Sequence, residues 1–274
     1  MKGERRYLSY AILLFASTFV LVPLAWAIST SFKDLAEATA YPPRWVPMAP
    51  TLENYDFVVH SEKLRRYFQN SFEVILGTVV VSLLLGVPAA YAVERGKFYG
   101  KEGMMKALLA TKMLAGVAII VPLYLVISRI GLYDTRTALI AVYAATVIPT
   151  VVWLLRGFVA RVPKELEEAA EVDGCTPFGS FLRITLPLLR TGMVAAIVFI
   201  FVTIWNDFLI AYSLVQSEKN RTIQIGIYFF VSDTGVQWGR MMAAVLLSSA
   251  PVLLMYALLQ RSFIQGMGGG AVKE

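Results

Sequence analysis

Six long apolar stretches alternate with polar segments along this chain of 274 residues. A helix needs about 20 mainly apolar residues to cross a hydrocarbon core of about 30 Å, and each stretch is long enough to do so. The pattern therefore predicts an all-α integral membrane protein, with six transmembrane helices at residues 8–28, 71–93, 107–127, 137–157, 192–214 and 241–259.

The polar segments between these stretches predict how the chain is organised. We expect residues 1–70 to form an N-terminal cytoplasmic segment, the first transmembrane helix and a long outer loop. Residues 71–259 are expected to form a core domain of five transmembrane helices that contains a cytoplasmic loop at 158–191, and residues 260–274 a cytoplasmic tail. Four glycines of the tail predict that it is not helical, because each interior glycine costs about 1 kcal/mol relative to alanine; they are Gly266, Gly268, Gly269 and Gly270.

The direction of insertion follows from the basic residues. Lys and Arg are more numerous in the segments that share a side with the N-terminus than in the alternate segments, which favours both termini in the cytoplasm. A cleaved signal peptide is the alternative for the first stretch, but its apolar run is longer than usual and ends at Trp26 and Ile28 rather than at a small-residue cleavage site. We therefore expect a retained helix.

Composition excludes several other classes of function. The chain is 57% hydrophobic and 16% charged, whereas a soluble domain has roughly a quarter charged residues. Its net charge of +6 is not gathered in a patch or tail, so nucleic acid is not an expected partner. The single cysteine, Cys175, and the single histidine, His60, leave no disulfide pair and no metal-site spacing.

The loop at 158–191 predicts two short helices joined by a sharp turn. Pro163 suits the first position of a helix, Gly174 supplies the left-handed residue that ends it, and Thr176 with Pro177 starts the second helix. The first helix is expected to place Lys164, Glu167, Glu168 and Glu171 on one face and Leu166, Ala169, Ala170 and Asp173 on another. The two alanines allow close approach by another chain. A connector that rests on the membrane surface is the alternative, although such helices usually present Lys and Arg to lipid.

The spacing of this loop resembles the EAA loop of ABC importer permeases. Glu168-Ala169-Ala170 is followed after three residues by Gly174, and nine residues later by Ile184 and Leu186-Pro187. Nearly the whole chain resembles the carbohydrate-uptake branch of that family. The residues that carry this wider resemblance are Ala89-Ala90-Tyr91-Ala92 with Arg95, Trp205-Asn206-Asp207-Phe208, and a maltose-permease-like tail at 266–273.

The resemblance implies a type I importer in the bacterial inner membrane. Such an importer combines this permease with a second permease subunit, two ATP-binding subunits that hold ATP and Mg²⁺, and an extracytoplasmic substrate-binding protein; no cofactor is expected in this chain. The resemblance also implies two ATPase-contacting regions. They are the EAA loop residues Glu168, Ala169, Ala170, Asp173, Gly174, Leu186 and Pro187, and the tail residues Gly269, Gly270, Ala271, Val272 and Lys273.

Polar residues also lie inside the predicted fifth helix. Asn206 and Asp207, next to Trp205, are near its middle, where a charge is costly unless it is paired or hydrated. Two interpretations stay open for these three residues: a translocation path, or a hydrogen-bonded helix interface.

The expected function is inward passage of a saccharide, driven by ATP hydrolysis in partner subunits. Import of a glycerol phosphate or a sugar alcohol by the same fold is one alternative. A secondary transporter is another, but such folds use broken helices with coupling-ion ligands, and this chain offers only Asp207. An enzyme is not expected, because residues 96–102 are one residue short of a phosphate-binding loop and lack its Ser or Thr.

Overall fold

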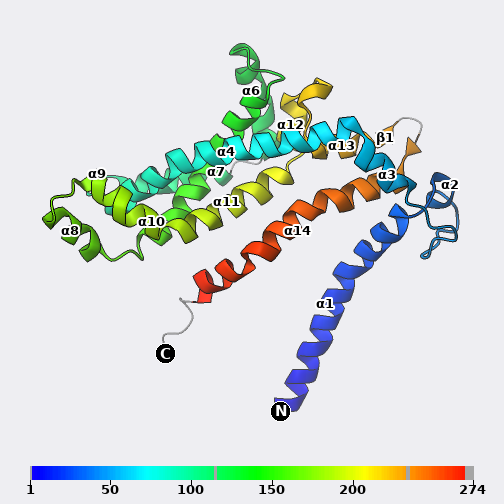
Figure 1. The fold of residues 1–274 in the computed structure, drawn as a ribbon, viewed down its shortest axis with the longest axis horizontal. Coiled ribbons are helices and arrows are strands. Elements are labelled where there is room, and N and C mark those ends of the chain that lie inside the picture. The colour runs from blue at the N-terminus through cyan, green and yellow to red at the C-terminus, as the bar shows by residue number, and fades with distance from the viewer. Residues whose placement is uncertain (1, 114–115, 233–234, 269–274) are drawn as a thin grey trace. The chain divides into compact units, whose positions relative to one another are not determined.

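The computed structural model describes residues 2–113, 116–232 and 235–268, and the described part is mainly helical (Figure 1). In its first half the elements are α1 (Lys2–Ser31), α2 (Leu35–Ala38), α3 (Glu53–His60), α4 (Glu62–Arg95), α5 (Lys101–Ala110), the 3₁₀ turn η1 (Thr111–Met113) and α6 (Gly116–Arg129). In its second half they are α7 (Arg136–Val159), α8 (Lys164–Val172), α9 (Pro177–Ser180), the π-helical turn η2 (Phe181–Thr185), α10 (Leu186–Leu188), α11 (Arg190–Trp205), α12 (Leu209–Leu214), the 3₁₀ turn η3 (Glu218–Asn220), α13 (Ile223–Tyr228), β1 (Val231–Ser232), β2 (Gly235–Val236) and α14 (Trp238–Gly268).

Internal contacts divide the chain into two compact units. One consists of residues 1–66 and 226–253, and the other of residues 67–225 and 254–274. The predicted division at residues 70 and 259 stays a prediction. We describe the two units separately below.

In the second unit, α4, α7 and α11 pack closely through small residues. A Cβ atom on Gly77 of α4 would lie 2.6 Å from the Cδ1 atom of Ile140 on α7, and one on Gly192 of α11 would lie 2.7 Å from the ring of Phe158. Only glycine allows such close approach, as in many helix pairs within membranes. The short helices α8, α9 and α10 lie together at one end of this three-helix bundle (Figure 1).

Four of the described helices are long and apolar enough to cross a membrane: residues 9–31, 62–95, 136–159 and 238–258. The prediction of one uninterrupted helix over residues 192–214 is wrong, because α11 ends at Trp205 and α12 begins at Leu209. The stretch at 107–127 is likewise divided between α5, η1 and α6. The total of six spans therefore stays a prediction.

In the first unit, side chains at the end of α1 hold the outer loop. The Lys33 ammonium is buried, donates to the carbonyl oxygen of Arg44, and lies 4.4 Å from the centre of the Trp26 ring. The Asn54 amide of α3 donates to the carbonyl oxygens of Ser31 and Lys33, at 3.0 and 2.7 Å. These bonds satisfy the backbone groups where α1 ends and fix the path of the loop.

The end of α14 corrects the prediction for the tail. The helix continues through Gly266 to Gly268, although glycine is a poor helix former. Extending an existing long helix adds one hydrogen bond for each residue fixed and avoids the cost of nucleation, which offsets the glycine penalty. The predicted ATPase-contacting tail residues, 269–273, lie outside the described residues.

Candidate functional site

The loop between α7 and α11 forms the predicted helix, turn and second helix. Gly174 has a φ of +89°, the left-handed conformation that glycine tolerates best, and the backbone N–H of Cys175 donates to the carbonyl of Ala170 at 2.9 Å. The Thr176 hydroxyl accepts from the Gly179 N–H at 3.1 Å and caps α9, as expected. One detail differs: Pro163 is the N-cap residue, with an extended ψ of 130°, and α8 begins at Lys164.

The second helix of the loop contains a feature that local sequence signals did not reveal. Residues Phe181–Thr185 form a π-helical turn, which widens the helix by one residue per turn. Both Phe181 and Thr185 are buried there. The Phe181 ring lies 4.7 Å from that of Tyr91 on α4, so the turn joins the loop to a membrane helix.

The predicted faces of α8 are wrong in two places. Glu167, which was predicted to share a face with Lys164, Glu168 and Glu171, is only 7% exposed, and Ala170, predicted to lie on the other face and to allow close approach by another chain, is buried inside this one. The two residues lie three positions apart and so share the inner face of the helix. Burial of the Glu167 carboxylate is possible because a cation from a distant part of the sequence compensates its charge.

That cation is Arg95, at the last residue of α4. Its Nε atom donates to both Glu167 oxygens at 3.1 Å, and its Nη2 atom donates to Glu167 Oε1 at 3.1 Å and to the carbonyl oxygen of Val162 at 2.6 Å. Two hydroxyl groups complete the cluster: Thr185 donates to Glu167 Oε1 at 2.7 Å, and Tyr91 donates to Oε2 at 3.2 Å. The two charged side chains are 11% and 10% exposed.

Three large apolar side chains of the loop are exposed, among charged ones. Leu166 is 45% exposed, Val172 88% and Phe178 68%. Among the seven predicted coupling residues, Ala170 is buried and Leu186 is half-buried, whereas the exposed ones are Glu168, Ala169, Asp173, Gly174 and Pro187. These exposed side chains leave apolar area on the loop that a partner chain could bury.

The break after α11 brings Asp207 against α7. Asp207 Oδ1 accepts a hydrogen bond from the Tyr143 hydroxyl at 2.7 Å and from the backbone N–H groups of Ile210 and Ala211 at 3.1 and 3.2 Å. These backbone bonds start α12 anew, which explains why the helix does not continue.

The two neighbours of Asp207 differ in position. The Trp205 side chain is 2% exposed and its ring is stacked on that of Phe201, with ring centres 5.3 Å apart. The Asn206 side chain is exposed, and its Nδ2 atom donates to the carbonyl oxygen of Val202 at 2.8 Å. The structure therefore places Trp205 in the helix interface and Asn206 on the surface of the unit.

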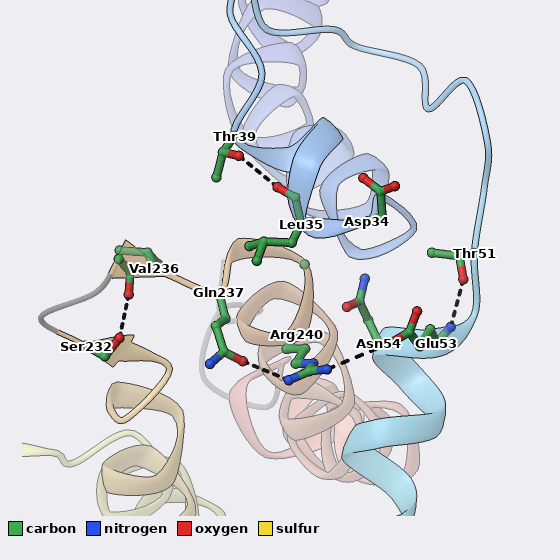
Figure 2. A pocket seen from close by; sticks show the side chains of 12 residues that line it. Asp34, Leu35, Thr39, Thr51, Glu53, Asn54, Ser232, Val236, Gln237 and Arg240 are labelled. Carbon is green, nitrogen blue, oxygen red and sulfur yellow. Dashed lines mark hydrogen bonds and ion pairs between the residues drawn. The ribbon is translucent and has the colours of Figure 1, made fainter.

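The first unit contains a separate cavity of about 440 Å³ with polar and apolar lining residues (Figure 2). The Arg240 guanidinium lies 4.1 Å from the centre of the Phe57 ring, donates to Gln237 Oε1 at 3.1 Å, and lies 3.9 Å from Glu53 Oε1. Asp34 and Thr51 also line the cavity. Sequence patterns gave no signal for this cavity, because its lining comes from two distant parts of the chain. No group of three or more His, Cys, Asp and Glu side chains in the described ranges is placed to hold a metal ion.

Comparisons with known proteins agree with this architecture. Residues 82–268 match the family described as binding-protein-dependent transport system inner membrane component. The match covers more than half of the chain, so the chain belongs to this family, and it is an ABC transporter permease of the inner membrane.

Individual relatives extend the comparison to almost the full length. The inner membrane ABC transporter permease protein YcjP of Escherichia coli K12 is 35% identical, over 97% of this chain and 95% of that protein. The diacetylchitobiose uptake system permease protein DasC of Streptomyces coelicolor is 31% identical, over 96% of this chain and 95% of that protein. A chain of a bacterial ABC transporter involved in the import of the acidic polysaccharide alginate has the same fold, with a TM-score of 0.81 at 21% identity over 95% of this chain and 98% of that chain. The predicted family and the permease fold are confirmed.

Proposed function

We propose that this permease carries a saccharide inward across the bacterial membrane, coupled to ATP hydrolysis in partner subunits through the loop at 158–191. The observation that carries the proposal is the folded loop with exposed apolar side chains, at one end of the α4–α7–α11 bundle. The diacetylchitobiose and alginate transporters among its relatives support a saccharide as the substrate.

The coupling surface is formed by the exposed loop residues. Ala169 and Gly174 leave room for a partner backbone to approach, while Leu166 and Val172 offer apolar area to bury. Ala170 and Leu186 contribute indirectly, because they pack inside the loop and support its fold. ATP and Mg²⁺ are bound by the partner ATPases, and the residues at 269–273 extend the contact with them.

The helix break supplies the second part of the proposal. Asn206 presents an exposed amide two residues before Phe208, whose ring is stacked on that of Tyr212 with the ring centres 5.0 Å apart. Amide groups next to aromatic faces suit a polyhydroxylated ligand. Asn206 is therefore the member of the Trp205–Asp207 group that lines the translocation path, and Asp207 holds the break in shape.

The remaining partners follow from the family. A substrate-binding protein delivers the saccharide on the extracytoplasmic side, a second permease completes the path, and both termini of this chain lie in the cytoplasm. The cavity beside Arg240 (Figure 2) belongs to the outer side in this orientation.

Reconstitution tests this function against a secondary transporter. The permease is purified with its second permease and ATPase subunits, inserted into liposomes, and supplied with binding protein and labelled oligosaccharide. Uptake is expected only with ATP and binding protein together. Uptake by the permease alone, driven by a sodium or proton gradient, would contradict the proposal.

A further inference from the structure

Glu167 holds the loop through a single carboxylate that receives hydrogen bonds from three side chains. Arg95 and Tyr91 approach from α4, and Thr185 from the π-helical turn. The backbone of Glu167 takes part as well, since its carbonyl oxygen accepts from the Ser180 hydroxyl at 3.3 Å. Both halves of the loop and the end of α4 therefore meet at one residue.

The geometry of the pair makes it stiff. The planar guanidinium of Arg95 presents a fork of donors to the carboxylate, an arrangement that fixes direction as well as distance. The same guanidinium also bonds to the carbonyl of Val162, in the short connection between α7 and α8. Because both charges are largely shielded from water, loss of either charge leaves the other uncompensated.

We propose that Glu167 and Arg95 are a positioning pair that passes displacement of α8 directly to α4. This inference rests on the proposed function, in which a partner ATPase moves the loop. Along the chain, α8 is joined to α7 before it and, through α9, η2 and α10, to α11 after it. The ion pair adds a third connection to α4, a helix of 34 residues. With it, α4, α7 and α11 respond together when the loop is displaced.

Two conservative substitutions test the pair in the complete transporter. Glu167→Gln keeps the shape and the acceptor oxygen but removes the charge, and Arg95→Lys keeps the charge but removes the fork. Glu165→Gln, an exposed acid on the same helix, is the matched control. The readouts are saccharide transported per ATP hydrolysed, basal ATPase activity, and recovery of the ATPase subunit in a pull-down.

We expect both variants to assemble and to retain basal ATPase activity. The ratio of transport to hydrolysis should fall, within the about 5- to 150-fold range that is typical of coupling between sites, while Glu165→Gln keeps the ratio of the parent. Labelling of the Cys175 thiol from the cytoplasmic side reports whether the turn keeps its fold. Unchanged labelling together with a lower ratio supports the pair as a positioning device.

Two outcomes would overturn the inference. The first is a normal ratio in both variants. The second is failed assembly with increased Cys175 labelling, which would show that the pair only maintains the loop. A variant of the outer face, Ala169→Trp, separates this inference from the proposed function. If Ala169→Trp abolishes coupling while Glu167→Gln does not, the role of the Glu167–Arg95 pair is contradicted and the proposed function stands. If neither substitution has any effect, coupling through the loop is contradicted as well.

Discussion

The Tyr143 hydroxyl on α7 donates a 2.7 Å hydrogen bond to the Asp207 carboxylate at the break between α11 and α12. The same carboxylate oxygen caps the first turn of α12. The Asp207 side chain thus lies at the helix break and joins this break to α7. An acceptor with these partners is stabilised although it lies within an apolar stretch.

Replacement of Asp207 should separate its charge from its hydrogen bonds. Asp207→Asn keeps an acceptor oxygen for Tyr143 and for the backbone, so we expect a modest loss of transport. Asp207→Leu leaves the Tyr143 hydroxyl and two backbone N–H groups without this acceptor, at a cost of about 1–3 kcal/mol for a buried group. The measurements are uptake into liposomes and thermal unfolding in detergent, with Thr203→Ala, an exposed position on α11, as the control. Full tolerance of leucine with loss of function in the Asn variant would contradict this account.

Ala169 and its neighbour Ala170 predict opposite outcomes for the same substitution. Ala169 is exposed, so Ala169→Trp should leave the loop folded and block the partner, with loss of substrate-stimulated ATPase activity. Ala170 is packed inside, so Ala170→Trp should overpack the loop by typically 1–3 kcal/mol and expose the Cys175 thiol. Thiol labelling distinguishes the two. Equal labelling in both variants would show that the faces of α8 are assigned wrongly.

Gly174 forms the turn between α8 and α9 with a positive φ. Gly174→Val places a β-branched residue in the left-handed region, where even an ordinary residue costs about 1–2 kcal/mol. We expect loss of transport with normal membrane insertion. Gly174→Asn is the matched control, because asparagine adopts this conformation more readily than other residues. The account is refuted if the Val variant transports as well as the Asn variant.

Asp134 predicts a dependence of stability on pH. It adopts a positive φ of 59°, and its carboxylate accepts from the backbone N–H groups of Gln216 and Ser217 at 3.0 and 2.9 Å. Burial raises the pKa of this carboxyl, but the hydrogen bonds from Ser217, Gln216 and Asn220 together outweigh burial and lower the pKa below its ordinary value.

The pKa of the Asp134 carboxyl is lower in the folded protein than in the unfolded chain, where it is about 3.9. The ionised carboxylate therefore stabilises the fold above about pH 3.9, and this stabilisation is lost as pH falls through the pKa of the folded protein. Thermal unfolding between pH 3 and pH 7 should show a smaller acid-induced loss of stability in Asp134→Asn than in the parent. Asp56→Asn, on the exposed surface of α3, serves as the control. A parent and Asp134→Asn with parallel pH profiles would contradict the prediction.

The features that were predictable from the sequence are those with local causes. Gly174 and Thr176 act within four residues of themselves, so their turn and cap follow from residue type alone. The Arg95–Glu167 pair joins residues 72 positions apart, and helical spacing cannot reveal such a partner. For the same reason, Glu167 was predicted to share a face of α8 with Lys164, Glu168 and Glu171 and not with Ala170. The break at Asp207 was hidden by apolar residues on both sides, since hydropathy measures the environment of a segment and not its hydrogen bonding.

The dependence of Glu167 on residues of α4 limits how this permease can be recombined with others. A chimera that receives the loop at 163–188 from another permease would keep Arg95 and Tyr91 from this one. Unless the donor loop supplies a carboxylate at the matching place, the buried guanidinium would be left without its counter-charge. The smallest exchangeable module is therefore discontinuous in sequence: the loop together with the last turn of α4.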